Sequence, residues 1–363
     1  MLPVLYGMAL CALLMIVDPY DLRPWGLSPI LVDAEYPPDK TVNLIRVVAR
    51  QPHDLVMFGG STTMPFTAPR LNAVFGSKSA VNLSYMAPMP TDTAPVLLRL
   101  VETPGLKRLI VAVDFSEMRR DGDTFYLGGS AVTSLRAHWY DMPDFTRPVA
   151  RASLNRLWGR AFDIPGWRGE VTALVDAPSV TTHTDYMALL NDAVSHPDPA
   201  MDAQASAIAC AAYPYLTQVL LPVGRAALQR GVHIDIVFPP IPFQTYYNWQ
   251  KNHLEFSSWE KGAHHRQLVG FYGCIVKTIA AAHLANVTVH ATDTDRRLTD
   301  LADYRDTVHL TKSATLTAML QDIRDRTTVV TPESLDAFGR LIDEGIADVR
   351  TWRWSDRRSS PPR

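Results

Sequence analysis

The chain has 363 residues, of which 47% are hydrophobic and 20% are charged, and its formal net charge at neutral pH is −2. At about 100–200 residues per domain, this length holds one large domain with insertions or two domains. The balanced composition excludes a wholly disordered chain, a collagen-like fibre and a many-span membrane protein. The charge is near neutral, and no basic stripe interleaved with aromatic residues occurs before the last dozen positions, so nucleic acid is not expected as a partner.

The first 17 residues form an uninterrupted apolar run, MLPVLYGMALCALLMIV. As a helix this run would span about 25 Å, close to the hydrocarbon thickness of a bilayer. No small-residue cleavage signal precedes Asp18, so we expect an uncleaved membrane anchor rather than a removed signal peptide. The alternative is a buried helix of a soluble protein, which normally shows a polar face. We therefore expect an inner-membrane anchor and a periplasmic or other extracytoplasmic domain.

Residues 18–40 are rich in Pro and aromatic residues and predict an extended connector to a domain over residues 41–330. In that domain, short apolar strands alternate with segments of helical spacing. The expected strands are 54–58, 80–83, 109–113, 233–240 and 286–292. The expected helices are 41–50, 69–75, 93–101, 204–230 (kinked or divided by Pro214 and Pro222), 257–284 and one after Leu310. This alternation predicts an α/β fold with a three-layer, doubly wound, mostly parallel sheet.

Two segments depart from the alternation. Between Phe115 and about residue 200, Trp, Arg, Pro and Gly are scattered, and we interpret this stretch as an inserted cap rather than a second α/β domain. Residues 331–363 predict a helix at 332–349 and a basic Arg/Ser/Pro tail.

The cysteines are Cys11, Cys210 and Cys274, and none of them forms a CxxC pair. Cys11 lies in the apolar run, which leaves Cys210 and Cys274 as one candidate disulfide. Two buried reduced thiols in apolar helices is the favoured interpretation.

The first candidate for chemistry is GGSTT at residues 59–63, directly after an expected strand. Ligands of parallel α/β sheets bind beyond the carboxyl ends of the strands. The glycines allow a sharp turn that would present Ser61 Oγ and the following N–H groups there. Taken alone, such a turn is more often a helix N-cap or a phosphate cradle.

The second candidate is DTVHL at residues 306–310, just before an expected helix. A hydrolytic serine needs an imidazole to accept its proton and a carboxylate to fix the imidazole tautomer. The spacing of Asp306 and His309 on a tight turn allows them to hydrogen-bond. Taken alone, His309 would be a residue at a helix start and Asp306 its N-cap.

In chain order these segments resemble the SGNH/GDSL hydrolase superfamily, in which a GDS-like block comes first and a DxxH block last. VNLSYMAP (81–88) is similar to the second block, LIVAVDFSEM (109–118) occupies the place of the third, and IDIVFPPIPF (234–243) is similar to a strand end of the membrane-anchored bacterial subgroup. The connector VDPYDLRPWG also resembles that subgroup, whose members resemble polysaccharide O-acetyltransferases and esterases.

The resemblance implies Ser61 as nucleophile, His309 as general base and acid, and Asp306 as its orienting partner. It places the backbone N–H of Ser61 and an N–H of the Met86–Ala87 turn at the oxyanion, where each donor is worth about 100- to 1000-fold in rate.

The chain departs from the family pattern in each block. Gly60 stands where the family has Asp, the second-block Gly is missing, and Asp114 lies in a third block without Asn. Either another donor, such as Asn82 or Ser84, substitutes at the oxyanion, with Thr62 near the site, or the protein is slow or inactive. Asp114 is either part of the site or a buried hydrogen-bonded acid.

Two further groups are weaker candidates. Glu260 and His264 with His265 lack a third ligand at suitable spacing, so no metal site and no cofactor is expected. Tyr246, Tyr247 and Trp249, with Phe243, would either stack on a sugar ring or pack as an ordinary loop.

The leading hypothesis is therefore a membrane-anchored serine acyl enzyme, an esterase or O-acetyltransferase, acting on cell-surface or exported polysaccharide. The alternative is a catalytically lapsed SGNH fold that binds carbohydrate or acts as an assembly subunit with exopolysaccharide-export proteins. The third hypothesis is a soluble lipase or peptidase-like esterase.

Overall fold

The computed structural model describes part of the chain in detail. The described residues are 52–84, 90–113, 115–118, 209–246, 265–299, 303–305 and 308–351. The expected anchor at 1–17, the connector at 18–40 and most of the expected cap lie outside them. Among the helices in the described ranges, none combines the length and apolarity needed for a membrane span.

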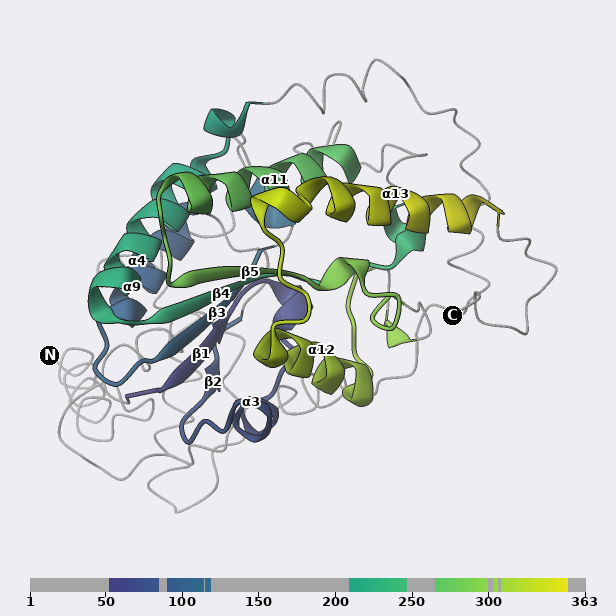
Figure 1. Cartoon of the computed structure of the whole chain (residues 1–363). Coiled ribbons are helices and arrows are strands. Elements are labelled where there is room, and N and C mark those ends of the chain that lie inside the picture. Colours follow the sequence, from purple (N-terminus) through teal and green to yellow (C-terminus); the bar gives the residue numbers. More distant parts are fainter. Residues whose placement is uncertain are drawn as a thin grey trace, which may run out of the picture.

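A five-stranded, entirely parallel sheet forms the centre of the described region (Figure 1). Its strands are β1 (Leu55–Phe58), β2 (Val81–Asn82), β3 (Arg108–Ala112), β4 (His233–Phe238) and β5 (Val287–Ala291). They lie in the order β2-β1-β3-β4-β5. The α/β class predicted from the alternating pattern is confirmed, and all five strands fall at predicted positions.

Helices cover both faces of this sheet (Figure 1). One face carries α4 (Pro90–Val101), α9 (Leu221–Arg230) and α11 (His265–Ala281), with α13 (Leu335–Thr351) beside α11. The other face carries α3 (Ala68–Phe75) and α12 (Ser313–Asp325), which contact each other. The first crossover, through α3, and the second, through α4, therefore lie on opposite faces.

Proline and glycine set several helix boundaries. Within the expected 204–230 helix, Pro214 precedes a π-helical segment, Tyr215–Leu220, which continues into α9 because the Leu221 amide donates to the Leu216 carbonyl. Pro222, which has no N–H group to donate, lies where the π-helical geometry changes to that of α9. Gly231 then ends α9 with φ of 70°, a left-handed conformation that glycine adopts without strain.

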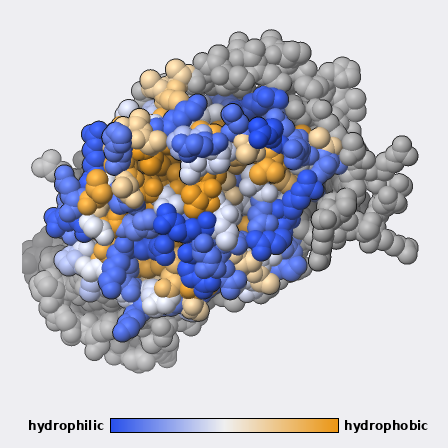
Figure 2. Space-filling view, viewed as in Figure 1, coloured by the Kyte–Doolittle hydropathy of each residue, from blue (hydrophilic) through white to orange (hydrophobic). Residues whose placement is uncertain are grey.

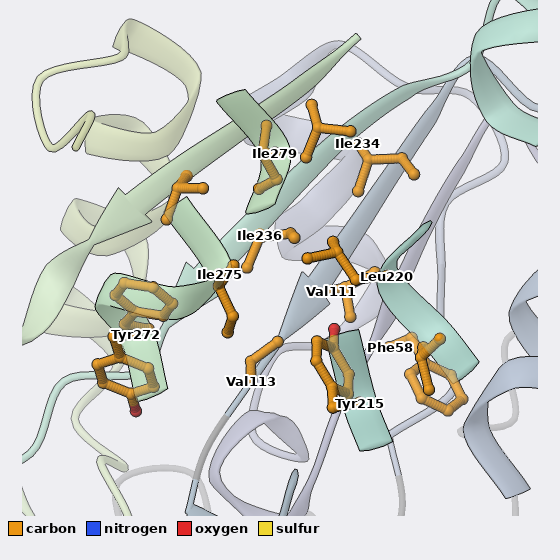
Figure 3. Close-up of a cluster of buried hydrophobic side chains, with 14 of the residues drawn as sticks. Phe58, Val111, Val113, Tyr215, Leu220, Ile234, Ile236, Tyr272, Ile275 and Ile279 are labelled. Atoms are coloured by element: carbon orange, nitrogen blue, oxygen red, sulfur yellow. The ribbon is translucent and has the colours of Figure 1, made fainter. Parts of the chain in front are cut away.

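The strands bury side chains on both faces, as expected for a covered parallel sheet. Val56 and Phe58 point into the larger core under α4, α9 and α11, whereas Leu55 and Met57 point into the core under α3 and α12. Figure 3 shows Phe58 in the larger cluster with other side chains of the sheet and of the helices above it. This burial holds the ends of the strands in fixed positions.

A polar cluster interrupts the apolar face near the start of β4. Asp235 is fully buried, and its carboxylate lies 2.8 Å from Arg108 Nε, 3.0 Å from His233 Nε2 and 3.2 Å from His290 Nε2. Burial alone would raise the pKa of Asp235. The hydrogen bonds from the two histidines and the charge of Arg108 outweigh burial and hold the pKa well below its ordinary value. The cluster therefore ties β3, β4 and β5 together through an ionised carboxylate.

The outer edge of β5 is not left open. The Ala291 amide donates to the Thr328 carbonyl at 2.9 Å, and the Val330 amide donates to the Val289 carbonyl at 2.9 Å. The 328–330 segment thus occupies backbone groups that an exposed edge strand would offer to another chain.

Figure 2 shows one face of the molecule, with hydrophilic side chains over most of the described surface and hydrophobic ones gathered near its middle.

Cys210 and Cys274 form a disulfide with Cα atoms 5.4 Å apart. The interpretation of these residues as reduced thiols was wrong. Cys274 lies on α11 and Cys210 in a short 3-10 turn before the π-helical segment, and the fold brings the two together across 64 residues. Sequence spacing carries no signal for such a long-range approach.

Candidate active site

The strand order reverses direction between β1 and β3, because β2 lies on one side of β1 and the later strands lie on the other. At such a switch point the two adjoining crossovers leave on opposite faces and open a crevice beyond the carboxyl ends of the strands. The GGSTT segment begins there, directly after β1. The sheet therefore places Ser61 at the position where this fold class binds its ligands.

Gly59 allows the chain to turn closely at this point. A Cβ at Gly59 would lie 2.6 Å from Thr63 Oγ1 and 2.8 Å from the Ala112 Cβ at the end of β3. Both distances are below ordinary contact, so a larger residue would push the turn away from β3. Gly60 has extended backbone angles, φ −82° and ψ −166°, which any residue adopts.

Ser61 begins a single 3-10 turn, Ser61–Thr63, that is fixed by its own hydrogen bonds. The amide and the hydroxyl of Thr63 both donate to the Gly60 carbonyl, at 3.1 and 2.9 Å. Thr62 and Thr63 are buried, while Ser61 is partly exposed. The Ser61 amide has no hydrogen-bond acceptor among the described residues. A nucleophile hydroxyl and a backbone donor are thus available on the same residue.

Asn82, at the end of β2, forms hydrogen bonds with the backbone of the turn that carries Ser61 and of the residues after it. Its side-chain amide donates to the carbonyls of Thr63 and Phe66, both at 2.7 Å, and its Oδ1 accepts from the Ser84 amide at 2.9 Å. Both N–H bonds of the side chain are engaged. The expectation that Asn82 substitutes as an oxyanion donor is therefore wrong for this geometry.

Ser84, the other expected substitute, is also engaged by the turn. Its Oγ lies 2.6 Å from Thr63 Oγ1. Because Thr63 directs its single hydroxyl hydrogen at Gly60, Ser84 is the donor to Thr63. Ser84 thus stabilises the turn rather than presenting its proton to the crevice.

His309 comes from a loop between β5 and α12 that closes on itself. The Arg305 amide donates to the His309 carbonyl at 2.9 Å, and Tyr304 forms an antiparallel bridge with Leu310. The Tyr304 hydroxyl donates to the Leu298 carbonyl at 2.6 Å in the buried interior. These bonds fix the backbone on both sides of His309.

Asp303 joins this loop to the start of α12, and sequence reasoning missed it. Its carbonyl accepts the amides of Thr311 and Lys312, at 3.1 and 3.2 Å. Its buried carboxylate pairs with Lys312 Nζ at 2.5 Å and accepts the Thr315 hydroxyl. A carboxylate is favoured near the N-terminus of a helix, because the positive end of the helix dipole lies there. The only sequence signal was an acidic residue shortly before an expected helix.

The turn and the loop bring Ser61 and His309 together. Ser61 Oγ lies 2.9 Å from His309 Nε2, although the residues are 248 positions apart. With a neutral imidazole whose Nε2 is unprotonated, the serine hydroxyl donates to Nε2. This is the contact by which an imidazole activates a serine nucleophile.

Several predicted site residues lie outside the described residues. These are Asp306, Ala87, Asp114, Tyr247 and Trp249. The structure therefore places the serine and histidine of the expected triad, and leaves its carboxylate as a prediction.

Tyr246 was expected either to stack on a sugar ring or to pack as an ordinary loop residue, and the structure shows it packed in the interior. Its side chain is fully buried, and its hydroxyl donates to Asp293 Oδ2 at 2.7 Å. Asp293 follows β5 and is itself fully buried, and burial raises its pKa to about 7. A ring enclosed in this way has no face for a substrate, so the sugar-stacking alternative is excluded for Tyr246 and the packing alternative is confirmed.

No group of three or more metal-binding side chains occurs within the described ranges. His265, from the weak metal candidate, is buried, and its Nε2 lies 3.7 Å from Asp343 Oδ1. No protein-family model, curated protein or solved structure matches the chain.

Proposed function

We propose that this protein is a serine acyl enzyme of the SGNH type, an esterase or O-acetyltransferase acting on acetylated cell-surface or exported polysaccharide. The observation that carries the proposal is the 2.9 Å contact between Ser61 Oγ and His309 Nε2 at the carboxyl end of the sheet. The SGNH type is supported by the chain order of the segments that resemble the SGNH/GDSL blocks. The choice of polysaccharide as substrate is taken from the same resemblance.

The proposed reaction has two steps. Ser61 Oγ attacks the acetyl carbonyl carbon while its proton passes to His309 Nε2. The Ser61 amide donates to the resulting oxyanion, and His309 returns the proton to the departing alkoxide as the acetyl-serine forms. A sugar hydroxyl or water then attacks the acetyl carbon of the acetyl-serine and gives its proton to His309. His309 passes this proton to the departing Ser61 Oγ, so that the acetylated sugar or acetic acid leaves and the free serine is restored. Asp306 is proposed to hold the imidazole through Nδ1.

The disulfide supports a location outside the cytosol. Disulfides persist in oxidising compartments such as the periplasm and are rare in the cytosol. The Cys210–Cys274 bond therefore agrees with the proposed anchor at residues 1–17 and an extracytoplasmic domain.

Ester turnover tests the enzymatic proposal. The full chain is assayed on p-nitrophenyl acetate between about pH 5 and pH 9, beside Ser61→Ala, His309→Ala and the control Ser334→Ala. Ser334 caps a 3-10 turn, Pro332–Ser334, that contacts α11 and α13, so we expect its replacement to leave the Ser61 turn unchanged. We expect each site variant to lose at least about a thousandfold in kcat/KM. Activity that survives Ser61→Ala contradicts the proposal.

A second candidate is a catalytically lapsed fold that binds carbohydrate or assists exopolysaccharide assembly. The observation favouring it is that Asn82 and Ser84, the two expected substitutes for the missing oxyanion donor, are both engaged within the turn. This candidate predicts that a fluorophosphonate does not label Ser61, while glycan binding is the same in the native protein and in Ser61→Ala. Labelling of the native protein that Ser61→Ala removes decides for the enzyme.

A further inference from the structure

The turn that carries Ser61 is held from three directions. Gly59 packs against Ala112 of β3, the Thr63 hydroxyl closes the turn on Gly60, and Asn82 reaches across from β2. Of these, Asn82 provides the only side-chain hydrogen bonds from β2 to the backbone of the turn among the described residues.

The two carbonyls that Asn82 binds belong to a continuous stretch of backbone. The Phe66 amide donates to the Thr63 carbonyl at 3.2 Å, so Asn82 and Phe66 share that acceptor. With the second bond, to the Phe66 carbonyl, the amide of Asn82 spans the chain from the end of the 3-10 turn to the start of α3. A shift of this stretch would move Ser61 directly, because Ser61 lies two residues before Thr63.

We propose that Asn82 is a positioning residue for Ser61, and that its side-chain amide sets the Ser61–His309 geometry. This inference rests on the proposed function. Asn82 itself touches neither the nucleophile nor the base, since its two donors and its acceptor are all engaged by backbone groups. It acts by keeping the reacting oxygen within hydrogen-bond distance of the imidazole, and a misplacement of about 1 Å costs on the order of a hundredfold in rate.

Asn72 provides a matched control in the same crossover. It is also a partly buried asparagine, and its Oδ1 accepts the Ala80 amide at 2.9 Å, just before β2 begins. Asn72 therefore supports the amino end of β2, whereas Asn82 supports the carboxyl end beside Ser61. Replacing either residue removes partly buried hydrogen bonds, but of the two only Asn82 contacts the turn.

The test compares Asn82→Ala and the isosteric Asn82→Asp with Asn72→Ala in the full chain. Asn82→Asp replaces the amide donors with acceptor oxygens and retains the shape of the side chain. We expect kcat for p-nitrophenyl acetate to fall about a hundredfold in both Asn82 variants with KM unchanged. Asn72→Ala should lower the melting temperature and leave kcat unchanged.

Crystal structures of the same variants test the geometry independently of turnover. In the Asn82 variants the Ser61 Oγ to His309 Nε2 distance should exceed hydrogen-bond range, and in Asn72→Ala it should remain near the native value. A native distance in both Asn82 variants, or an unchanged kcat, overturns the inference. If Ser61→Ala retains full activity while the Asn82 variants show the displaced serine, the proposed function fails and the positioning role stands.

Discussion

Replacing Asp293 with asparagine is expected to stabilise the protein in alkaline solution. Asp293 is fully buried beyond the end of β5. Among the described residues, the Tyr246 hydroxyl is the one side-chain group of another residue that donates a hydrogen bond to the Asp293 carboxylate. Burial raises the pKa of Asp293 from 3.8 to about 7. The folded protein therefore retains a proton at this carboxyl that the unfolded chain releases in mild acid.

The sign and size of the effect follow from this difference in proton binding. Between about pH 4 and pH 7 the folded state binds more protons than the unfolded state, so the free energy of unfolding falls as the pH rises. A shift of about three pKa units at about 1.4 kcal/mol per unit gives a loss of up to about 4 kcal/mol above pH 7. Asparagine accepts the Tyr246 hydrogen bond without carrying a charge, so Asp293→Asn should escape this loss.

Urea unfolding at about pH 5 and about pH 8.5 measures the effect. The native chain should lose stability between the two conditions, while Asp293→Asn should lose much less. Glu344→Gln is the control, because it removes a carboxylate from an exposed position on α13. If Asp293→Asn and the native chain have the same pH dependence, the buried carboxyl does not titrate as described and the reasoning is refuted.

Three further changes test other parts of the fold. Asp235→Asn should cost about 3–5 kcal/mol at neutral pH, measured by urea unfolding, because it breaks a buried ion cluster. The depressed pKa of Asp235 implies that the native chain loses this advantage as the pH falls below about 4; a variant as stable as the native chain at neutral pH would exclude this role. Replacing Cys210 and Cys274 with serine opens a 64-residue loop and should lower stability by about 4 kcal/mol, with a melting temperature insensitive to reductant; a native melting temperature would contradict this. Gly59→Ala should cost about 1–3 kcal/mol in thermal unfolding and reduce ester turnover, since the new Cβ meets Thr63; unchanged turnover would show that the turn can relax.

Much of the sheet could be predicted because its signal is local. β1 and β3, with the sequences LVMF and RLIVA, are short apolar runs with residues buried on both faces. Helix limits could also be predicted where proline or glycine sets them, as at Pro69 in the first turn of α3 and at Gly231 after α9. The alternation of strands and helices then predicts a parallel sheet.

The partners of side chains were less predictable, because they depend on approaches between distant segments. Asn82 was assigned to the oxyanion because it stands near the expected site, yet its amide faces the backbone of the turn. Tyr246 lies after a strand end, as expected, but its ring points into the interior toward Asp293. A sequence shows which residues reach an edge of the sheet, and it does not show which way each side chain turns there.

The contact between Ser61 and His309 joins the turn after β1 to the loop that follows β5. The two side chains therefore meet only in a molecule in which β1, β5 and the loop before α12 are all in their native places. A nascent chain that ends before residue 309 holds Ser61 without its imidazole, and we expect it to be unreactive toward esters. Covalent capture of Ser61 by an ester-like probe would therefore count only those molecules whose entire sheet is assembled, which makes the serine a reporter of completed folding.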